Sequence, residues 1–399
     1  MDPIRNPYAP GAGVQPPELT GRTEFLERAR IAIARTQLGR PAKSFIAVGL
    51  RGVGKTVLLN RIAELGRDAN CRTAVLEAHE DKPLPALLLP EMRRLMLELD
   101  RLGAISEQAK RALRTLKSFA RAVKLKYGEV EIGLDIDPEV GSADSGDLEA
   151  DLPELFVALG QAARARGVAV LLVLDEIQYL SELELSALIM ALHRSSQLGL
   201  PILFAGAGLP QVVGLTGRSK SYAERLFDFP VVDALSQDDA KKALVEPAGD
   251  EGIEFTEEAL HEILRLTQGY PYFLQEWGYH VWNVAASSPI LVQDVERATI
   301  LAVQRLDESF FRVRFDRLTP SEKRYVRAMA ELGPGPHRSG EIAGVLGVKV
   351  TTVGPVRDKL IAKGMIYSPQ HGDTAFTVPL FDEFLRRALP LEQGAPRRT

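Results

Sequence analysis

The sequence predicts an α/β protein whose parallel sheet is covered by helices, and three observations carry this prediction. Short apolar runs alternate with stretches of helical periodicity over the first half of the chain. The run at residues 44–48 is followed by a glycine-rich loop and then by a helical pattern. A second run, at residues 168–174, ends directly in the acidic pair Asp175 and Glu176. Continuous apolar strands of this kind are typical of a sheet that is buried on both faces.

The loop at residues 49–56 reads GLRGVGKT, which is the spacing G-x-x-x-x-G-K-[ST] of a phosphate-binding loop. Its glycines let backbone N–H groups turn inward, and the helix that follows would present its N-terminus to the phosphates. We expect Lys55 to act on the phosphates and to face solvent until phosphate arrives. The expected nucleotide contacts of the loop are Gly49, Leu50, Arg51, Gly52, Val53, Gly54, Lys55, Thr56 and Val57.

The acidic pair supplies the second half of the expected site. The carboxyl ends of parallel strands are where ligands bind in α/β sheets, and Asp175 and Glu176 follow such a strand. We expect Asp175 and the Thr56 hydroxyl to hold a magnesium ion, and Glu176 to polarise the attacking water. The alternative is a strand end with two solvated carboxylates. The pair favours hydrolysis as well as binding.

The remaining strands of the sheet lie on either side of this acidic pair. Residues 73–76 read as a strand, and residues 84–99 read as a helix. An amphipathic helix at residues 182–197 precedes a further strand at residues 201–206. This alternation of strands and helices predicts a parallel sheet with covered faces.

Length and composition exclude several classes of protein. A chain of 399 residues should form two or three domains, because single cores seldom exceed about 250–300 residues. No apolar stretch reaches the roughly 20 residues that span a membrane, and the first residues do not resemble a signal peptide. The single cysteine, Cys71, excludes an internal disulfide framework and a cysteine-based zinc site. We therefore expect a cytoplasmic protein with no membrane partner.

Charge is unevenly distributed along the chain. From residue 305 to the end there are 16 Lys and Arg residues against 11 Asp and Glu residues, which permits DNA binding without demanding it. Residues 107–126 contain seven basic groups and one acid, whereas residues 129–154 contain ten acids and no base. Most of these residues lie within an expected insertion at residues 100–151. The insertion either contacts a partner or forms a self-neutralising surface lobe, and the adjacency of the opposite charges favours the lobe.

The C-terminal region has the pattern of a winged helix. Three helices are expected at residues 320–332, 339–347 and 350–363, followed by strands that begin at residues 364 and 374. Helix-turn-helix domains place the second helix of the motif in the major groove of double-stranded DNA. The alternative is a winged helix that packs against protein or closes over a nucleotide. The expected DNA contacts are Thr351, Thr352, Arg357 and Lys359.

The order of the segments PPELTGR, GLRGVGKT, LLVLDE, ILFAGAG and AERLFDF resembles AAA-type ATPases related to replication initiators and to signal-transducing ATPases with numerous domains. The resemblance implies that the nucleotide is ATP and that Leu19 and Arg22 lie beside the adenine. It also implies self-association, because initiator-like members carry an arginine at the position of Arg225 that reaches the γ-phosphate of a neighbouring subunit. The alternative is a surface arginine paired with Glu224 or Asp228.

Two departures from motor ATPases favour a slow switch. The strand tip FAGAGL offers only alanine and glycine where motors usually present a polar residue to the γ-phosphate. The segment GYPYFLQ at residues 269–275 stands where a second sensing arginine is usual. It resembles the signal-transducing members, in which the region of Pro271 packs on the nucleotide. Structurally, Pro271 is also a favourable first-turn helix residue.

Together these features predict five segments. They are a flexible segment at residues 1–17, a P-loop ATPase core at residues 18–234, a helical lid at residues 235–305, a winged helix at residues 306–389 and a flexible tail at residues 390–399. The expected function is an ATP-binding, slowly hydrolysing switch that uses magnesium and couples nucleotide state to DNA or partner binding. The alternative is a signalling ATPase whose winged helix seals the nucleotide and binds protein.

Overall fold

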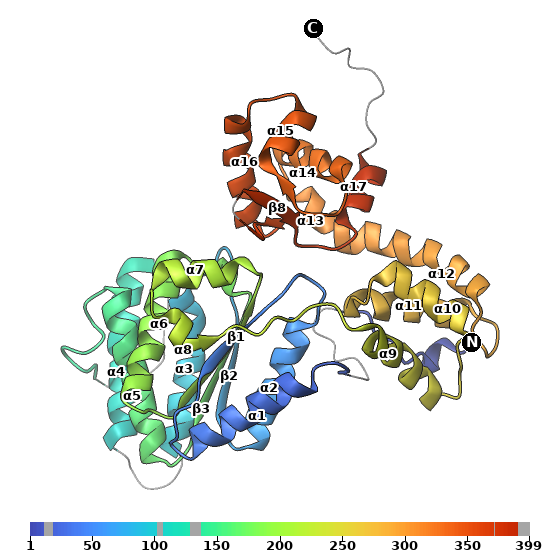
Figure 1. The fold of residues 1–399 in the computed structure, drawn as a ribbon. Helices are drawn as coiled ribbons and strands as arrows, with labels where there is room; N and C mark the ends of the chain where they lie inside the picture. The colour runs from blue at the N-terminus through green and yellow to red at the C-terminus, as the bar shows by residue number, and fades with distance from the viewer. Residues whose placement is uncertain (12–18, 102–106, 128–136, 371, 390–399) are drawn as a thin grey trace.

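The computed structural model describes residues 1–11, 19–101, 107–127, 137–370 and 372–389. Figure 1 shows a core that contains the sheet, a group of helices beside it, and a C-terminal module that lies above both. In the described part of the chain, no helix is long and apolar enough to cross a membrane.

The core is built on a five-stranded parallel sheet in the order β2-β3-β4-β1-β5. This sheet confirms the predicted fold class. The C-terminal end of β1, where the glycine-rich loop begins, lies beside β4 and one strand from β3. The strands are β1 (Ser44–Val48), β2 (Arg72–Glu77), β3 (Val170–Asp175), β4 (Ile202–Gly208) and β5 (Phe227–Asp228).

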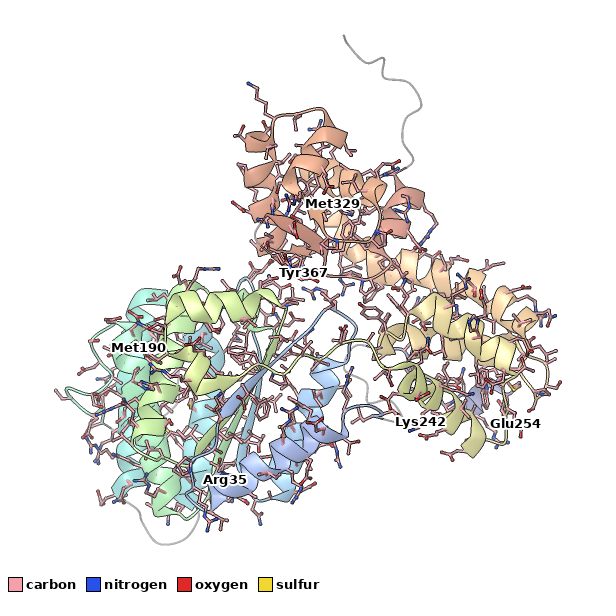
Figure 2. All side chains as sticks on the ribbon, in the orientation of Figure 1. Arg35, Met190, Lys242, Glu254, Met329 and Tyr367 are labelled. Atoms are coloured by element: carbon pink, nitrogen blue, oxygen red, sulfur yellow. The ribbon has the colours of Figure 1, made fainter. Side chains whose placement is uncertain are left out.

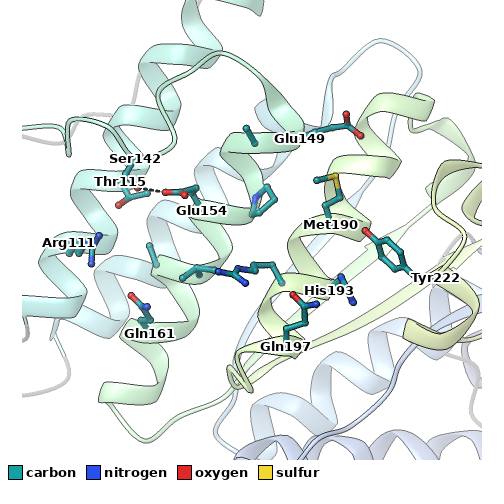
Figure 3. Close-up of a pocket in the computed structure, with 15 residues that line it drawn as sticks. Arg111, Thr115, Ser142, Glu149, Glu154, Gln161, Met190, His193, Gln197 and Tyr222 are labelled. Atoms are coloured by element: carbon teal, nitrogen blue, oxygen red, sulfur yellow. Dashed lines mark hydrogen bonds between the residues drawn. The ribbon is translucent and has the colours of Figure 1, made fainter.

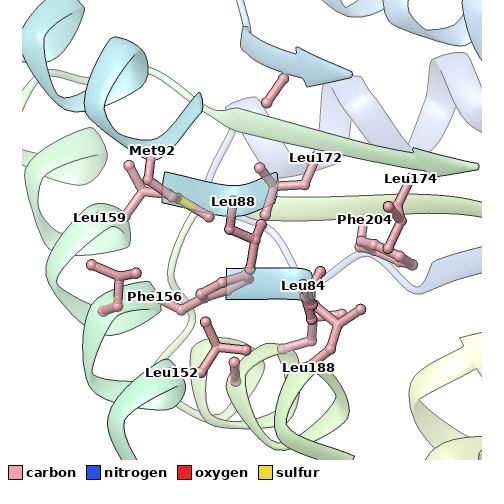
Figure 4. Close-up of a cluster of buried hydrophobic side chains, with 14 of the residues drawn as sticks. Leu84, Leu88, Met92, Leu152, Phe156, Leu159, Leu172, Leu174, Leu188 and Phe204 are labelled. Atoms are coloured by element: carbon pink, nitrogen blue, oxygen red, sulfur yellow. The ribbon is translucent and has the colours of Figure 1, made fainter. Parts of the chain in front are cut away.

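Helices cover both faces of the sheet because successive strand residues point to opposite sides. Phe45 and Ala47 of β1 pack with α1 and α2, whereas Ile46 and Val48 belong to the core on the other face. Figure 4 shows that second core, in which residues of α3, α5 and α6 meet Leu172 and Phe204 of the sheet. The helices of the core are α1 (Thr23–Gln37), α2 (Lys55–Asp68), α3 (Leu84–Arg101), α4 (Glu107–Tyr127), α5 (Leu148–Ala165), α6 (Glu182–Gln197), α7 (Gln211–Ser219) and α8 (Ala223–Leu226).

The expected insertion differs from a peripheral lobe. Its helix α4 packs on α5, and Leu116 and Phe119 are buried in the same core as the sheet. Arg114 pairs with Glu139 at 2.8 Å, so part of its basic charge is neutralised within the insertion, as the sequence indicated. Because one face of α4 is apolar, the insertion adds an outer layer to the core rather than standing apart from it.

Four helices form a bundle that we call the lid. They are α9 (Gln237–Asp250), α10 (Glu257–Thr267), α11 (Pro271–Val284) and α12 (Val292–Arg305). The first residues of the chain pack on this bundle: Tyr8 is buried and its hydroxyl donates to the carbonyl of Leu244. A Cβ on Gly278 would lie 2.6 Å from the Tyr8 ring, so glycine makes room for it. The expectation of a flexible start is therefore wrong for residues 1–11, while residues 12–17 lie outside the described part.

We call the elements that follow the lid the C-terminal module. Its small antiparallel sheet has the order β6-β8-β7 and packs with three helices, and α16 continues through Pro355 despite the missing backbone donor. The helices expected at residues 320–332, 339–347 and 350–363 are all present, with ends that agree within one residue. The elements are a π-helix η3 (Leu306–Phe311), α13 (Arg312–Asp316), α14 (Pro320–Leu332), β6 (His337–Arg338), α15 (Ser339–Leu346), α16 (Val350–Ala362), β7 (Ile366–Tyr367), β8 (Asp373–Phe376) and α17 (Phe381–Ala388).

Candidate active site

The loop between β1 and α2 has the backbone geometry that its glycines permit. Gly52 and Gly54 have φ angles of +83° and +91°, in the left-handed region that residues with a side chain rarely adopt. A Cβ on Gly49 would lie 2.0 Å from the carbonyl oxygen of Val232. Gly54 also caps the N-terminus of α2, where backbone N–H groups and the helix dipole favour an anion. The loop therefore fits a phosphate group.

Lys55 lies inside this loop. Its ammonium donates to the carbonyls of Gly49 and Leu50, at 3.0 and 2.8 Å, and only 7% of the residue is exposed. The expectation that Lys55 faces solvent is therefore wrong. Burial lowers the pKa of Lys55 to about 8, against the opposing effect of Glu176 and Asp175. A buried cation of this kind is stabilised by an arriving anion.

Thr56 and Asp175 come together across the site. The Thr56 hydroxyl donates to Asp175 Oδ2 at 2.6 Å, and burial raises the pKa of Asp175. A carboxylate and a hydroxyl are ligands that Mg²⁺ accepts, and a divalent cation would offset the burial of the carboxylate. Within the described ranges no group of three acidic, His or Cys side chains forms a metal cage. Phosphate and water oxygens would therefore complete the coordination.

Glu176 is held by two side chains in an uncommon backbone conformation. Its φ angle is +54°, a region that costs free energy for a residue with a side chain and is often found at functional sites. Arg51 Nη1 lies 3.5 Å from Glu176 Oε1, and the Gln178 amide donates to Oε2. Arg51 also donates to the Tyr179 hydroxyl at 2.8 Å. Both carboxylate oxygens therefore have partners at the edge of the site.

Gln178 is a functional candidate that sequence reasoning missed. Its Oε1 accepts from the backbone N–H of Leu209 at 3.0 Å, so the amide bridges Glu176 and the tip of β4. A Cβ on Gly208 would lie 2.9 Å from this oxygen. The strand tip FAGAGL has no polar side chain of its own, as the sequence showed. The Gln178 side chain, from the loop after β3, occupies the space beside it. Its position three residues beyond Asp175 was the available signal.

The residues expected from the resemblance are distributed around the loop. Arg22 donates to the carbonyls of Val53 and Asp233, which joins the N-terminal side of the core to the loop. Leu19 is half-buried. Pro271 begins α11, and the N–H of the following Tyr272 donates to the Gly52 carbonyl at 3.1 Å.

The C-terminal module lies directly on the phosphate-binding loop. The backbone N–H of Arg51 donates to the carbonyl of Thr377, which follows β8, at 3.0 Å. A Cβ on Gly364 would lie 3.1 Å from Arg51 Nη2, so the module approaches this side chain closely. Figure 2 shows Tyr367 on the side of the module that faces the core. Burial, then Asp233 and Tyr367, raises the pKa of Tyr270 to about 12.

Two further contacts join the core and the module at the rim of a groove. Gln211 Nε2 of α7 donates to the carbonyl of Ile361 at 3.3 Å, and Arg317 pairs with Glu80 at 3.5 Å. The groove has a volume of about 1130 Å³ and is lined by α7, by the loops after β2 and β3, and by the second half of α16. Arg357 and Asp358 line it from α16.

The residues expected to bind DNA do not share one face. Thr351, Thr352 and Lys359 are exposed. Arg357 instead donates to Thr374 Oγ1 at 2.9 Å and to the Asp373 carbonyl at 3.0 Å, which ties α16 to β8. Only 17% of its side chain is exposed. The structure thus separates Arg357 from the exposed threonines.

Arg225 lies near the amino ends of the strands, whereas the phosphate-binding loop begins at their carboxyl ends. Arg225 precedes β5, whose Phe227 pairs with Ser44 at the start of β1. The side chain is exposed, and Asp228, one of its expected partners, pairs with Lys43 at 2.6 Å. Arg225 therefore cannot reach the nucleotide site of its own chain.

A second pocket, shown in Figure 3, lies away from the predicted nucleotide site. It has a volume of about 460 Å³ and is formed by α4, α5 and α6 with Tyr222. Arg111, Glu149, Glu154 and His193 are among its lining residues. Its lining carries charges of both signs and includes none of the site residues predicted from the sequence, so this pocket is distinct from the phosphate-binding loop.

Comparison with known proteins identifies the class of the core. Residues 18–205 match the AAA ATPase domain family, and residues 308–385 match a domain of unknown function (DUF8462). A search of curated proteins found no match to the sequence. The chain therefore contains an AAA-type P-loop ATPase domain, which is an ATP-binding domain.

One solved structure supports this fold, and two others are similar at lower TM-scores. A Walker-type ATPase of Pyrococcus abyssi is 17% identical, with 93% of this chain and 97% of that chain covered and a TM-score of 0.56. The ORC1 protein of Aeropyrum pernix in complex with DNA is 16% identical, with 93% and 94% covered and a TM-score of 0.47. The RuvB Holliday junction branch migration motor of Thermotoga maritima is 16% identical, with 91% and 96% covered and a TM-score of 0.43.

Proposed function

We propose that the protein is an ATP-hydrolysing switch whose C-terminal module docks over the phosphate-binding loop. The observation that carries the proposal is the hydrogen bond between the Arg51 N–H of the loop and the Thr377 carbonyl of the module, at 3.0 Å. Because this N–H belongs to the phosphate-binding loop itself, whatever the loop binds changes the free energy of docking.

The site residues divide the chemistry among them. Bound ATP with Mg²⁺ supplies the phosphoryl group that is transferred to water. Lys55 holds the phosphates, and the Thr56 hydroxyl and the Asp175 carboxylate, 2.6 Å apart, hold the metal ion. Glu176 orients and polarises the attacking water. Turnover is slow because Glu176 must first give up contacts with Arg51 and Gln178.

Docking also restricts access to α16. The second half of this helix lines the groove opposite α7, so a partner that uses this half requires the module to move. We interpret the module as a winged helix whose exposure follows the nucleotide state. Docking of the module on the phosphate-binding loop supports the alternative in which the winged helix seals the nucleotide and binds protein.

DNA binding is the second candidate for the output of the switch. Thr351, Thr352 and Lys359 are exposed on α16, and the chain from residue 305 onward is basic on balance. Arg357 is assigned to internal support of the helix, because both of its hydrogen bonds are to β8 or its start.

Weakening the docking contacts tests the first proposal. A chain with Gln211→Ala and Arg317→Ala loses two contacts that join the core to the module and should bind ATP several-fold more weakly, on the order of 1 kcal/mol. The control is Arg61→Ala, which removes a surface pair with Glu64 on α2. Equal ATP affinity in both variants and the wild type would refute a link between docking and nucleotide binding.

Turnover measured with and without double-stranded DNA decides between the two outputs. If α16 contacts DNA, Lys359→Ala should weaken binding and reduce its salt dependence, since each phosphate contact contributes nearly one unit of slope. Arg357→Ala should instead destabilise the module. DNA that neither binds nor changes turnover would leave protein as the partner.

A further inference from the structure

Arg314 is a half-buried arginine that has no part in the proposed chemistry so far. It lies on α13, directly after the π-helix η3 that begins the module. Its guanidinium sits over the Phe310 ring, 4.1 Å from the centroid, and Nη1 donates to the Phe310 carbonyl. These two contacts fix the direction of the side chain.

Aromatic packing brings Arg314 to the phosphate-binding loop. The Phe310 ring stacks on Tyr272, with centroids 4.7 Å apart and an interplanar angle of 21°. The Tyr272 N–H donates to the Gly52 carbonyl, and a Cβ on Gly52 would lie 3.3 Å from Tyr272 Cβ. Two stacked rings, those of Phe310 and Tyr272, therefore lie between Arg314 and the loop, and the position of Arg314 depends on contacts that the loop itself makes.

A second guanidinium, that of Arg51, lies near Arg314 together with the carboxylate of Glu176. Burial, followed by the nearby Arg51, lowers the pKa of Arg314 to about 10, while Tyr272 and Glu176 act in the opposite direction. Arg51 reaches Glu176 at 3.5 Å, whereas no ion pair is found for Arg314 among the described residues. Two guanidinium groups, one from the core and one from helix α13 of the module, thus share the nearby carboxylate of Glu176.

We infer that Arg314 donates to the terminal phosphate of ATP bound in its own chain, and so joins the module to the nucleotide. This inference rests on the proposed nucleotide site. A guanidinium presents several N–H donors in a fixed plane and matches phosphate oxygens well. An anion between Arg51 and Arg314 would also relieve the repulsion between them. A triphosphate therefore tightens docking more than a diphosphate does.

Arg314 is suited to this role in a way that Arg225 is not. Arg225 lies near the amino ends of the strands, away from the loop, and can act only on a neighbouring chain. Arg314 is held beside the loop of its own chain by Phe310 and Tyr272. No sequence motif indicated this residue, because it lies outside the motifs and comes near the site only through the docked position of α13.

The test compares ATP and ADP affinities in full-length chains that carry Glu176→Gln, so that binding is measured without turnover. Arg314→Ala should weaken ATP binding roughly 10- to 100-fold, the range for a charge-assisted hydrogen bond to phosphate, and leave ADP affinity unchanged. Arg314→Lys should recover part of the loss. The matched control is Arg312→Ala on the same helix, where the side chain is exposed and pairs with Asp316.

Each outcome supports or overturns the assignment. If Arg314→Ala weakens ATP and ADP binding equally, its role is structural and the inference is wrong. If neither affinity changes, the inference is also wrong. Lys55→Ala serves as the reference for the site itself: retained ATP binding in that variant would refute the proposed nucleotide site. If Lys55→Ala loses ATP binding but Arg314→Ala keeps the wild-type ratio of ATP affinity to ADP affinity, the inference about Arg314 is refuted and the proposed nucleotide site stands.

Discussion

The carboxyl ends of the parallel strands form one edge of the sheet and their amino ends form the other. Charged side chains are largely buried at the first edge and exposed at the second. At the edge with the phosphate-binding loop, Arg51 and Glu176 are 17% and 21% exposed and come from segments far apart in the sequence. At the other edge, Lys43 and Asp228 are 42% and 58% exposed. Burial at the first edge strengthens electrostatic interactions and fixes side-chain directions, whereas solvent weakens them at the second. The first edge fits the proposed nucleotide site, whereas the charged groups at the second edge face solvent.

The largest effect is expected for Glu176→Gln at the loop edge. The amide preserves the shape of the side chain but cannot polarise water as the carboxylate does. Turnover should fall on the order of 10²- to 10⁴-fold, which is the usual contribution of a general base, while ATP still binds. Steady-state hydrolysis and equilibrium binding measure the two quantities separately. Turnover equal to that of the wild type would place the catalytic group elsewhere.

Lys55→Ala should have the next largest effect. Loss of the ammonium removes the cation of the loop, so ATP and ADP should each bind roughly 100-fold more weakly or worse. The fold should persist, because helix α2 and its apolar contacts are unchanged. Calorimetric titration measures the affinities, and circular dichroism checks the fold. Wild-type affinity would contradict the assignment of the loop.

Burial of Lys55 makes stability depend on pH at the loop edge. The folded pKa is about 8, below the ordinary value of 10.5, so the unfolded chain holds a proton that the folded chain has released between these values. The free energy of unfolding should therefore rise with pH from about 8 to 10.5, with a slope up to about 1.4 kcal/mol per unit. Lys55→Met should lack this rise. The same pH dependence in both proteins would show that burial does not lower the pKa of Lys55.

The smallest effect is expected for Arg225→Ala at the opposite edge. At low protein concentration the variant should hydrolyse ATP as the wild type does, because Arg225 cannot reach its own site. If chains associate, specific activity of the wild type should rise with concentration, and the variant should lose that rise. Mixing Arg225→Ala with Lys55→Ala should then restore some activity. Flat activity over the whole concentration range in both proteins would refute an oligomeric mechanism.

The same difference explains how much the sequence predicted. The strand at residues 44–48 and the helices at residues 182–197 and 320–332 have the expected ends, because apolar periodicity and capping residues are local signals. The loop and the Asp175–Glu176 pair were found because motif spacing is also local. Gln178 and Arg314 gain their positions from tertiary contacts and were not found in this way. Arg51 was expected as a loop residue, but its pairing with Glu176 was not. Arg357 was misplaced for the same reason, since β8 lies 16 residues away along the chain.

The most direct test of the account is the distance between the core and the C-terminal module as the nucleotide changes. Cys71 is buried, so spin labels can be placed at Glu182→Cys and Lys349→Cys, which are exposed on α6 and just before α16. In chains that carry Glu176→Gln, ATP should narrow the distance distribution around the docked position relative to ADP or no nucleotide. Arg314→Ala should remove this effect of ATP. A distribution that is the same with ATP, with ADP and without nucleotide would contradict the coupling of docking to the nucleotide.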